Sequence, residues 1–151
     1  MAASLPYPAL YATHAGIWMA LPDGRVEALG RGQAIARAAE TPLIMLNAPL
    51  VGQRLGYPEL SGLDLLELFA FVHPARFAVP TPNGFAKALG LEAPHSDAEA
   101  APFLLQAAAA LLERLEGAWP EREGAWASAQ SLYRLRWPWA APICERLKGP
   151  E

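Results

Sequence analysis

Apolar residues near the start of the chain form short runs broken by turn residues. The segments ALYATH (9–14), AGIWMAL (15–21) and RVEAL (25–29) predict strands, and Pro22-Asp23-Gly24 is typical of a tight turn between the last two. We expect a hairpin or a three-stranded meander. After Gly30-Arg31-Gly32 the apolar positions change to helical spacing, which predicts a short amphipathic helix over QAIARAAE (33–40).

A continuous apolar run follows Pro42. The segment LIMLNAP (43–49) has the composition of a buried central strand with both faces covered, and it should end at Asn47 or Ala48. Pro49 fits the first turn of a helix, where its missing N–H costs nothing. This helix is expected to run to Leu55, before Gly56.

The second half of the chain is dominated by helical periods. Pro102 lies inside the helix expected over 97–117, and it should kink that helix or move its beginning. Strands come first and helices later, which favours one α/β domain with a core over about 9–115 and a helical extension over about 119–148. The expected helices lie within 63–74, 81–91 (stopped by Gly90), 97–117, 122–136 and 143–149.

Composition narrows the class of protein. The 151 residues are 53% hydrophobic and 18% charged, which is typical of a single globular domain. No apolar run reaches the ~20 residues needed to cross a bilayer, and the N-terminus does not resemble an export signal. We therefore expect a cytoplasmic protein without a membrane partner. Cys144 is alone in the sequence, so an internal disulfide is excluded and a packing role is expected.

The net charge of −3 argues against a domain that grips nucleic acid over a wide surface, because such binding depends on neutralising phosphates. Any contact with single-stranded DNA must be local. Aromatic rings can stack on bases while arginines reach phosphates. The candidates are Tyr133, Arg134, Arg136, Trp137 and Trp139. The alternative is that Trp137 and Trp139 are core residues that hold the C-terminal helices.

Several kinds of site lack sequence support. Lys87 and Lys148 are the only lysines, and neither stands in a Walker A loop. Gly30-Arg31-Gly32 lacks the third glycine of a dinucleotide motif, which favours a plain turn before a helix. No serine has a nucleophile-elbow setting. The histidines, His14, His73 and His95, lack metal-ligand spacing, and His73 before Pro74 is expected to end a helix.

Two pairs of carboxylates remain as candidates for chemistry. Asp64 and Glu67 are three positions apart on a helix, and Asp97 and Glu99 stand at a helix start. One interpretation is surface charge and N-capping, which acids at a helix start favour. The other is an active nuclease that uses these four acids in a rearranged site.

The order of the motifs resembles the DEDD exonucleases, which have the ribonuclease-H-like fold. In that family a first strand carries Asp-x-Glu, and a later strand leads into Asn-Ala-x-Phe-Asp-x-x-Phe-Leu. An Asp-Thr-Leu segment, a helix ending in Leu-Gly-Leu and a helix opened by Asp-Ala follow. The similar pieces here, within residues 9–115, are Asn47-Ala48-Pro49-Leu50-Val51 with Leu55, Asp64-Leu65-Leu66, Ala88-Leu89-Gly90-Leu91 and Asp97-Ala98-Glu99-Ala100.

The resemblance implies an α/β fold, with a mixed sheet flanked by helices and a helical C-terminal extension, but without the metal ligands. The first strand has Tyr11-Ala12-Thr13 where the family has Asp-x-Glu, and Val51 stands where it has the second Asp. Glu92 occupies the position of the usual histidine, and His95 is out of register. Only Asp97 remains, and one carboxylate cannot hold two magnesium ions. The expected metal set is therefore none, with Asn47, Val51, Asp64 and Asp97 as remnant positions.

The sequence also resembles the N-terminal region of alphaproteobacterial ATP-dependent DNA helicases of the DinG type, above all in residues 46–82 and 119–140. This resemblance implies a helicase motor downstream in the same chain, with ATP and magnesium there and no cofactor in this stretch. The expected function is an inactive exonuclease-like accessory domain that guides nucleic acid or docks a partner. Alternatives are an active 3'-5' exonuclease, or a structural or oligomerising domain through the Ala- and Leu-rich residues 103–115.

Overall fold

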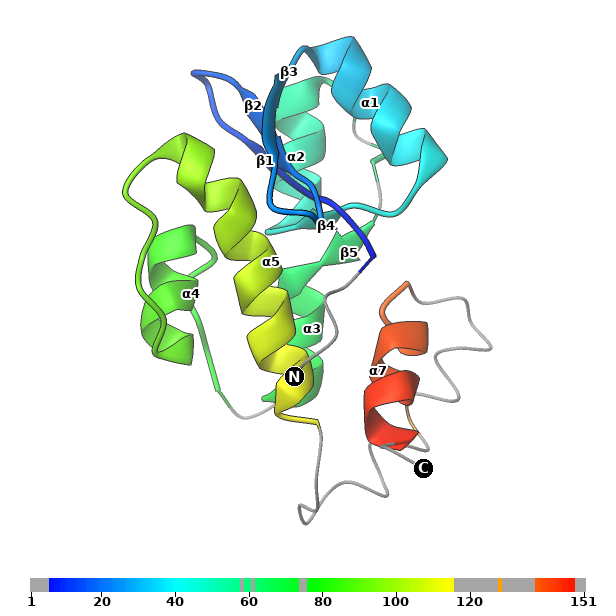
Figure 1. Ribbon diagram of the computed structural model, residues 1–151, viewed down its shortest axis with the longest axis vertical. Coiled ribbons are helices and arrows are strands. Elements are labelled where there is room, and N and C mark those ends of the chain that lie inside the picture. Colours follow the sequence, from blue (N-terminus) through cyan, green and yellow to red (C-terminus); the bar gives the residue numbers. More distant parts are fainter. Residues whose placement is uncertain are drawn as a thin grey trace.

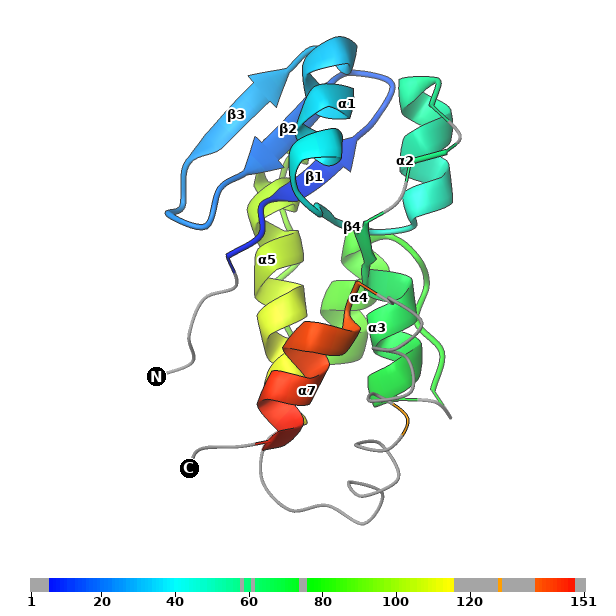
Figure 2. The same cartoon turned by 90° about the vertical axis from the view of Figure 1, so that its right-hand side faces the viewer.

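The computed structural model describes residues 6–57, 59–60, 62–73, 76–115, 128 and 138–148. In this part of the chain one mixed sheet lies between two layers of helices (Figures 1 and 2). The α/β class expected from the sequence is confirmed. The strands are β1 (Ala9–Ala12), β2 (Ile17–Ala20), β3 (Val26–Leu29), β4 (Ile44–Met45) and β5 (Leu63–Asp64).

The sheet has the strand order β3-β2-β1-β4-β5. The pairs β1–β2 and β2–β3 are antiparallel and form the meander expected from the sequence. The pairs β1–β4 and β4–β5 are parallel, so β1 joins the two halves at the centre. The carboxyl ends of these three parallel strands therefore meet at one edge, where ligand sites in open α/β sheets are usually found.

Six helices are described, and their boundaries follow ordinary capping rules. α2 and α4 end at glycines with positive φ, Gly56 (70°) and Gly90 (70°). Glycine adopts this left-handed conformation without the steric cost of a Cβ. His73 ends α3, as expected. The helices are α1 (Arg31–Glu40), α2 (Ala48–Leu55), α3 (Leu65–Val72), α4 (Pro82–Leu89), α5 (Asp97–Glu113) and α7 (Ala140–Lys148).

Alternation along the strands separates the core into two parts. In β1, Leu10 and Ala12 pack with α1 and α2, whereas Ala9 and Tyr11 face the opposite side, where α3, α4, α5 and α7 lie. β4 repeats the pattern, with Met45 on the first side and Ile44 on the second. Successive side chains of β4 thus lie on opposite faces of the sheet. Because both faces are covered by helices, the whole strand is apolar.

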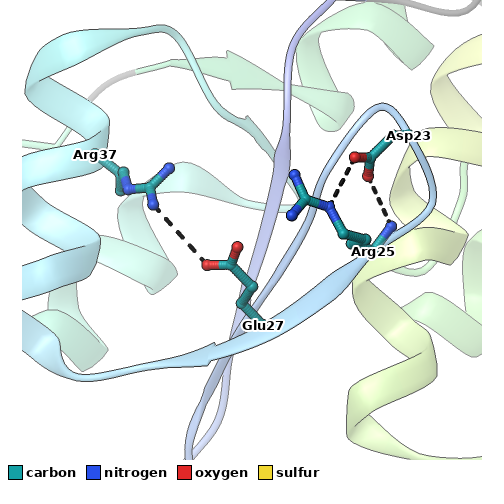
Figure 3. A network of polar contacts seen from close by, with 4 residues as sticks. All are labelled: Asp23, Arg25, Glu27 and Arg37. Carbon is teal, nitrogen blue, oxygen red and sulfur yellow. Dashed lines mark hydrogen bonds and ion pairs between the residues drawn. The ribbon is translucent and has the colours of Figure 1, made fainter.

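Surface charges hold the outer end of the meander (Figure 3). In the turn after β2, Arg25 donates from its Nε to Asp23 at 2.7 Å. Arg37 on α1 lies 3.9 Å from Glu27 on β3, so α1 is tied to the edge strand by one exposed ion pair. Exposed pairs of this kind contribute at most about 1 kcal/mol.

Three expectations about elements need correction. The segment after Gly62 first adds a short strand, β5, and the helix begins at Leu65 rather than 63. α5 begins at Asp97 and continues through Pro102, so the proline does not move its beginning. The last helix begins at Ala140 instead of 143. The helix expected over 122–136 lies outside the described residues except for residue 128.

The Ala- and Leu-rich face of α5 packs inside the monomer. Ala101, Leu104, Ala108 and Leu111 are fully buried in the core cluster beneath β1 and β2. This face is therefore used by the fold itself and is not a free surface for oligomerisation. None of the described helices is long and apolar enough to span a membrane.

Candidate functional site

The turn between β4 and α2 is built around Asn47. Its backbone is left-handed (φ 65°, ψ 73°), and it is the one non-glycine residue with positive φ in the described ranges. Asparagine tolerates this conformation better than most residues. Its Oδ1 accepts weakly from the Leu50 N–H at 3.4 Å and caps α2. The turn presents two successive N–H groups, of Asn47 and Ala48, to one point, an arrangement that binds anions.

The anion at that point is the carboxylate of Asp64. Its Oδ1 accepts from Asn47 N–H at 3.0 Å and Leu66 N–H at 2.9 Å, and its Oδ2 accepts from Ala48 N–H at 2.9 Å. The side chain is 5% exposed. One buried carboxylate therefore caps α3 and also accepts hydrogen bonds from N–H groups at the start of α2. The second and third motif pieces of the sequence, Asn47-Ala48 and Asp64-Leu65-Leu66, meet here for a structural reason.

Trp139 packs on the same residue. Its Nε1–H donates to the backbone oxygen of Asp64 at 2.7 Å, and the side chain has no exposed surface. A fully buried indole cannot stack on a base, so Trp139 is a core residue, and its assignment to a nucleic-acid contact is corrected. The other four candidates, Tyr133, Arg134, Arg136 and Trp137, lie outside the described residues.

The end of β1 meets the start of α5. Thr13 donates from its hydroxyl to Asp97 Oδ2 at 3.4 Å, a long contact between residues 84 positions apart. Burial raises the pKa of the neighbouring Tyr11 hydroxyl, Asp97 raises it further, and Arg54 opposes this effect. The first and last motif pieces of the sequence are thus brought together, with a phenol and a hydroxyl beside the single carboxylate.

The residues at the other motif positions make contacts of their own. Val51 is buried in the core cluster of α1 and α2, at 4% exposure. Glu99 accepts from the His95 N–H at 2.7 Å, and His95 pairs with Glu92 at 3.1 Å on the surface. In the described part of the chain, no group of three or more His, Cys, Asp or Glu side chains could hold a metal ion.

Capping accounts for part of the acid pattern. Asp64 is the N-cap of α3. The N-cap of α5 is Ser96 rather than Asp97, and Asp97 and Glu99 lie in the first turn of α5. Acids there interact favourably with the positive end of the helix. The Asp64 carboxylate accepts from three N–H groups, which supports the capping interpretation for this acid.

Two hollows lie near the end of β1 at this edge of the sheet. The smaller, about 340 Å³, lies beside Tyr11, Asp97, His95 and Asn83. The larger, about 610 Å³, lies between the β1–β2 turn and α2. Its charged and polar lining residues are Thr13, His14, Arg31, Gln53 and Arg54.

Sequence reasoning set aside Gly30-Arg31-Gly32 as a plain turn and did not single out Arg31 or Arg54 as ligands. They are 23 positions apart and belong to different helices, so no motif joins them. Arg54 also has an Nε that is buried and without a hydrogen-bond acceptor among the described residues. Leaving such a donor unpaired costs about 1–3 kcal/mol. The available signal in the sequence was Arg54 in the last turn of the helix expected to stop before Gly56.

Comparisons with known proteins give no assignment: no family model matches the chain, and no curated protein or solved structure matches it significantly.

Proposed function

We propose that this chain is a catalytically inactive, ribonuclease-H-like accessory domain of an ATP-dependent DNA helicase, in which it guides nucleic acid or docks a partner. The mixed five-stranded sheet with helices on both faces is compatible with that fold. The motor, its ATP and its magnesium belong to the proposed downstream part of the same chain.

The observation that carries the proposal is the chemistry at the end of β1. Asp97 reaches this strand from α5, as the last acid of a DEDD site would, but it meets Thr13 and lies within charge range of Tyr11. Two-metal phosphodiester cleavage needs several converging carboxylates. Neither Tyr11 nor Thr13 offers one, and Val51 is a buried apolar residue. The position supports binding rather than cleavage.

Loss of catalysis leaves a surface that can still hold a strand. The edge of the sheet carries two hollows near the end of β1, lined by hydroxyl, amide and arginine groups, and Tyr11 lines the smaller one. Single-strand binding proteins combine local positive charge with aromatic rings, and they need no metal. Because the net charge of the chain is −3, such binding should be weak and strongly dependent on salt.

The proposal is tested by incubating the protein with labelled single-stranded DNA and Mg²⁺ or Mn²⁺, alongside Asp97→Asn. We expect measurable binding by fluorescence anisotropy but no cleavage, and no difference in cleavage between the two proteins. Asp97-dependent cleavage would show that the domain is an active nuclease. Absence of binding at low salt would remove nucleic acid as its ligand and leave partner docking.

A second variant tests the inferred alignment of the site. Tyr11→Asp/Thr13→Glu restores an Asp-x-Glu at the end of β1, opposite Asp97. We expect this variant to bind Mn²⁺, and the further change Asp97→Asn to weaken that binding at least tenfold. If the triple variant binds Mn²⁺ as well as the double variant, Asp97 does not face the restored pair and the alignment is wrong.

A further inference from the structure

We propose that the hollow between the β1–β2 turn and α2 is a phosphate-binding site, with Arg31 and Arg54 as its two cationic ligands. The inference rests on the proposed function only for the source of the phosphate, a nucleic-acid strand. The site itself is argued from its lining residues.

The two arginines converge from different helices. Arg54 stands in the last turn of α2, and Arg31 is the first residue of α1. The Arg31 Nη1 lies 3.8 Å from where a Cβ on Gly56, the C-cap of α2, would stand. Arg31 therefore extends across to the end of α2 that carries Arg54. The negative end of that helix helps to keep the two cations close together.

A pair of arginines suits an oxyanion better than it suits other kinds of ligand. A guanidinium offers several N–H donors in a fixed plane, which matches phosphate oxygens. The Arg54 Nε–H is a donor without an acceptor among the described residues, although it is buried. Because that nitrogen is buried, a phosphate oxygen becomes its acceptor only when the guanidinium turns toward the hollow. No ion pair to an acid is found for either arginine within the described ranges.

The remaining lining residues fit a nucleotide rather than a bare ion. The volume, about 610 Å³, falls in the range of small-molecule sites. Gln53 and His14 offer further polar groups, and Leu50, which is 37% exposed, offers an apolar edge for a sugar or base. The Thr13 hydroxyl is already donated to Asp97.

The nearby charges still favour an anion. Among the described residues, no carboxylate lines the hollow, and Asp97 lies outside it, on the far side of Thr13. The described lining therefore carries two arginines and no acid. The phosphate can come from a single-stranded nucleic acid or from a free phosphate or nucleotide, and these sources are separated by experiment.

The experiment follows the Arg54 Nε–H signal by ¹H–¹⁵N NMR while inorganic phosphate or an eight-residue oligothymidylate is added. In parallel, oligonucleotide affinity is measured against salt for the wild type, for Arg31→Gln/Arg54→Gln and for a matched control, Arg25→Gln/Arg37→Gln. The control removes the same charge from two exposed arginines that do not line the hollow.

We expect both ligands to shift the Arg54 signal. The Arg31→Gln/Arg54→Gln variant should bind the oligonucleotide at least tenfold more weakly, and the slope of log K against log salt should become shallower by about 1.4 for two lost phosphate contacts. The control should stay within about twofold of the wild type, because charge outside the hollow contributes only through screened, long-range attraction.

The other outcomes are decisive as well. A shift with phosphate but none with the oligonucleotide supports the site with a free phosphate or nucleotide as its ligand, and removes strand guidance from the proposed function. No shift with either ligand overturns the site, even if the protein binds DNA elsewhere. An equal loss in the control variant shows general surface charge and also overturns it.

Discussion

At the scale of single residues, the chemistry of this protein is dominated by where one carboxylate is placed. Asp64 lies at the end of β5 and satisfies N–H groups at the starts of both α2 and α3. Its own backbone oxygen accepts from the indole of Trp139, which directly precedes the C-terminal helix α7. An acid that resembles a remnant of a catalytic motif thus has a structural role, because helix starts present unpaired donors that a buried carboxylate can satisfy.

Replacing Asp64 with alanine should lower the free energy of unfolding by about 3 kcal/mol. Hydrogen bonds to a charged acceptor are worth more than neutral ones, and their loss leaves buried N–H groups unpaired. Urea denaturation of the purified domain measures the change. Glu59→Ala, at an exposed position, serves as control and should change the stability by less than about 0.5 kcal/mol. Equal urea midpoints for Asp64→Ala and Glu59→Ala would show that the Asp64 carboxylate does not stabilise the starts of α2 and α3.

At the scale of elements, the short helix α2 fits closely against the turn that follows it. A Cβ built on Gly52 would lie 2.7 Å from the backbone oxygen of Tyr57, nearer than atoms can approach. The Tyr57 N–H also donates to the Gly52 oxygen at 2.8 Å, so the chain folds back directly over this glycine. Gly32 in α1 differs, since nothing lies within 4 Å of its Cβ position.

Alanine at these two glycines should therefore have opposite effects. Gly52→Ala forces the Tyr57 backbone to move, and overpacking of this kind costs roughly 1–3 kcal/mol. Gly32→Ala adds a better helix former in open space and should stabilise by up to about 1 kcal/mol. Thermal unfolding gives the sign directly: a lower Tm for Gly52→Ala and a higher Tm for Gly32→Ala. A Tm for Gly52→Ala at or above that of the wild type would contradict the close approach.

At the scale of the whole molecule, both faces of the sheet are covered. The global free energy of unfolding also depends on half-buried titratable groups such as His73. His73 ends α3 near the aromatic ring of Phe69, with ring centroids 5.2 Å apart. Burial lowers the pKa of His73, and Arg76 and Arg114 lower it further. Its Nε2 is buried without a partner among the described residues.

The sign of the resulting pH dependence follows from proton uptake. Between the lowered pKa of the folded state and the ordinary value of about 6.5, the unfolded chain binds more protons at this position. His73 therefore contributes stability above pH 6.5 that is lost as the pH falls toward the folded pKa. The free energy of unfolding of the wild type should fall between pH 7 and 5, and His73→Gln should reduce that slope.

The measurement is a series of urea titrations at fixed pH from 7 to 5, above the range where most carboxylates titrate. His14→Gln removes an exposed histidine in the turn after β1 and controls for the general effect of such a substitution. If both variants keep the wild-type slope, His73 is equally easy to protonate in the folded and unfolded states.

The sequence by itself determined the features that depend on near neighbours along the chain. The three strands of the meander, the helix stops at Gly56 and Gly90 and the cap at His73 were all predictable, because periodicity, turn chemistry and capping act over a few residues. The α/β class followed from the order of these elements.

Only the tertiary structure decided which distant residues meet. β5 is two residues long, too short for any period, and it exists because β4 pairs with it. The carboxylate of Asp64 contacts Asn47 and Ala48 across 17 and 16 positions, and Trp139 reaches the Asp64 backbone oxygen across 75. The convergence of Arg31 and Arg54 likewise arises from how α1 and α2 pack. Such contacts depend on how layers pack, which no local pattern encodes.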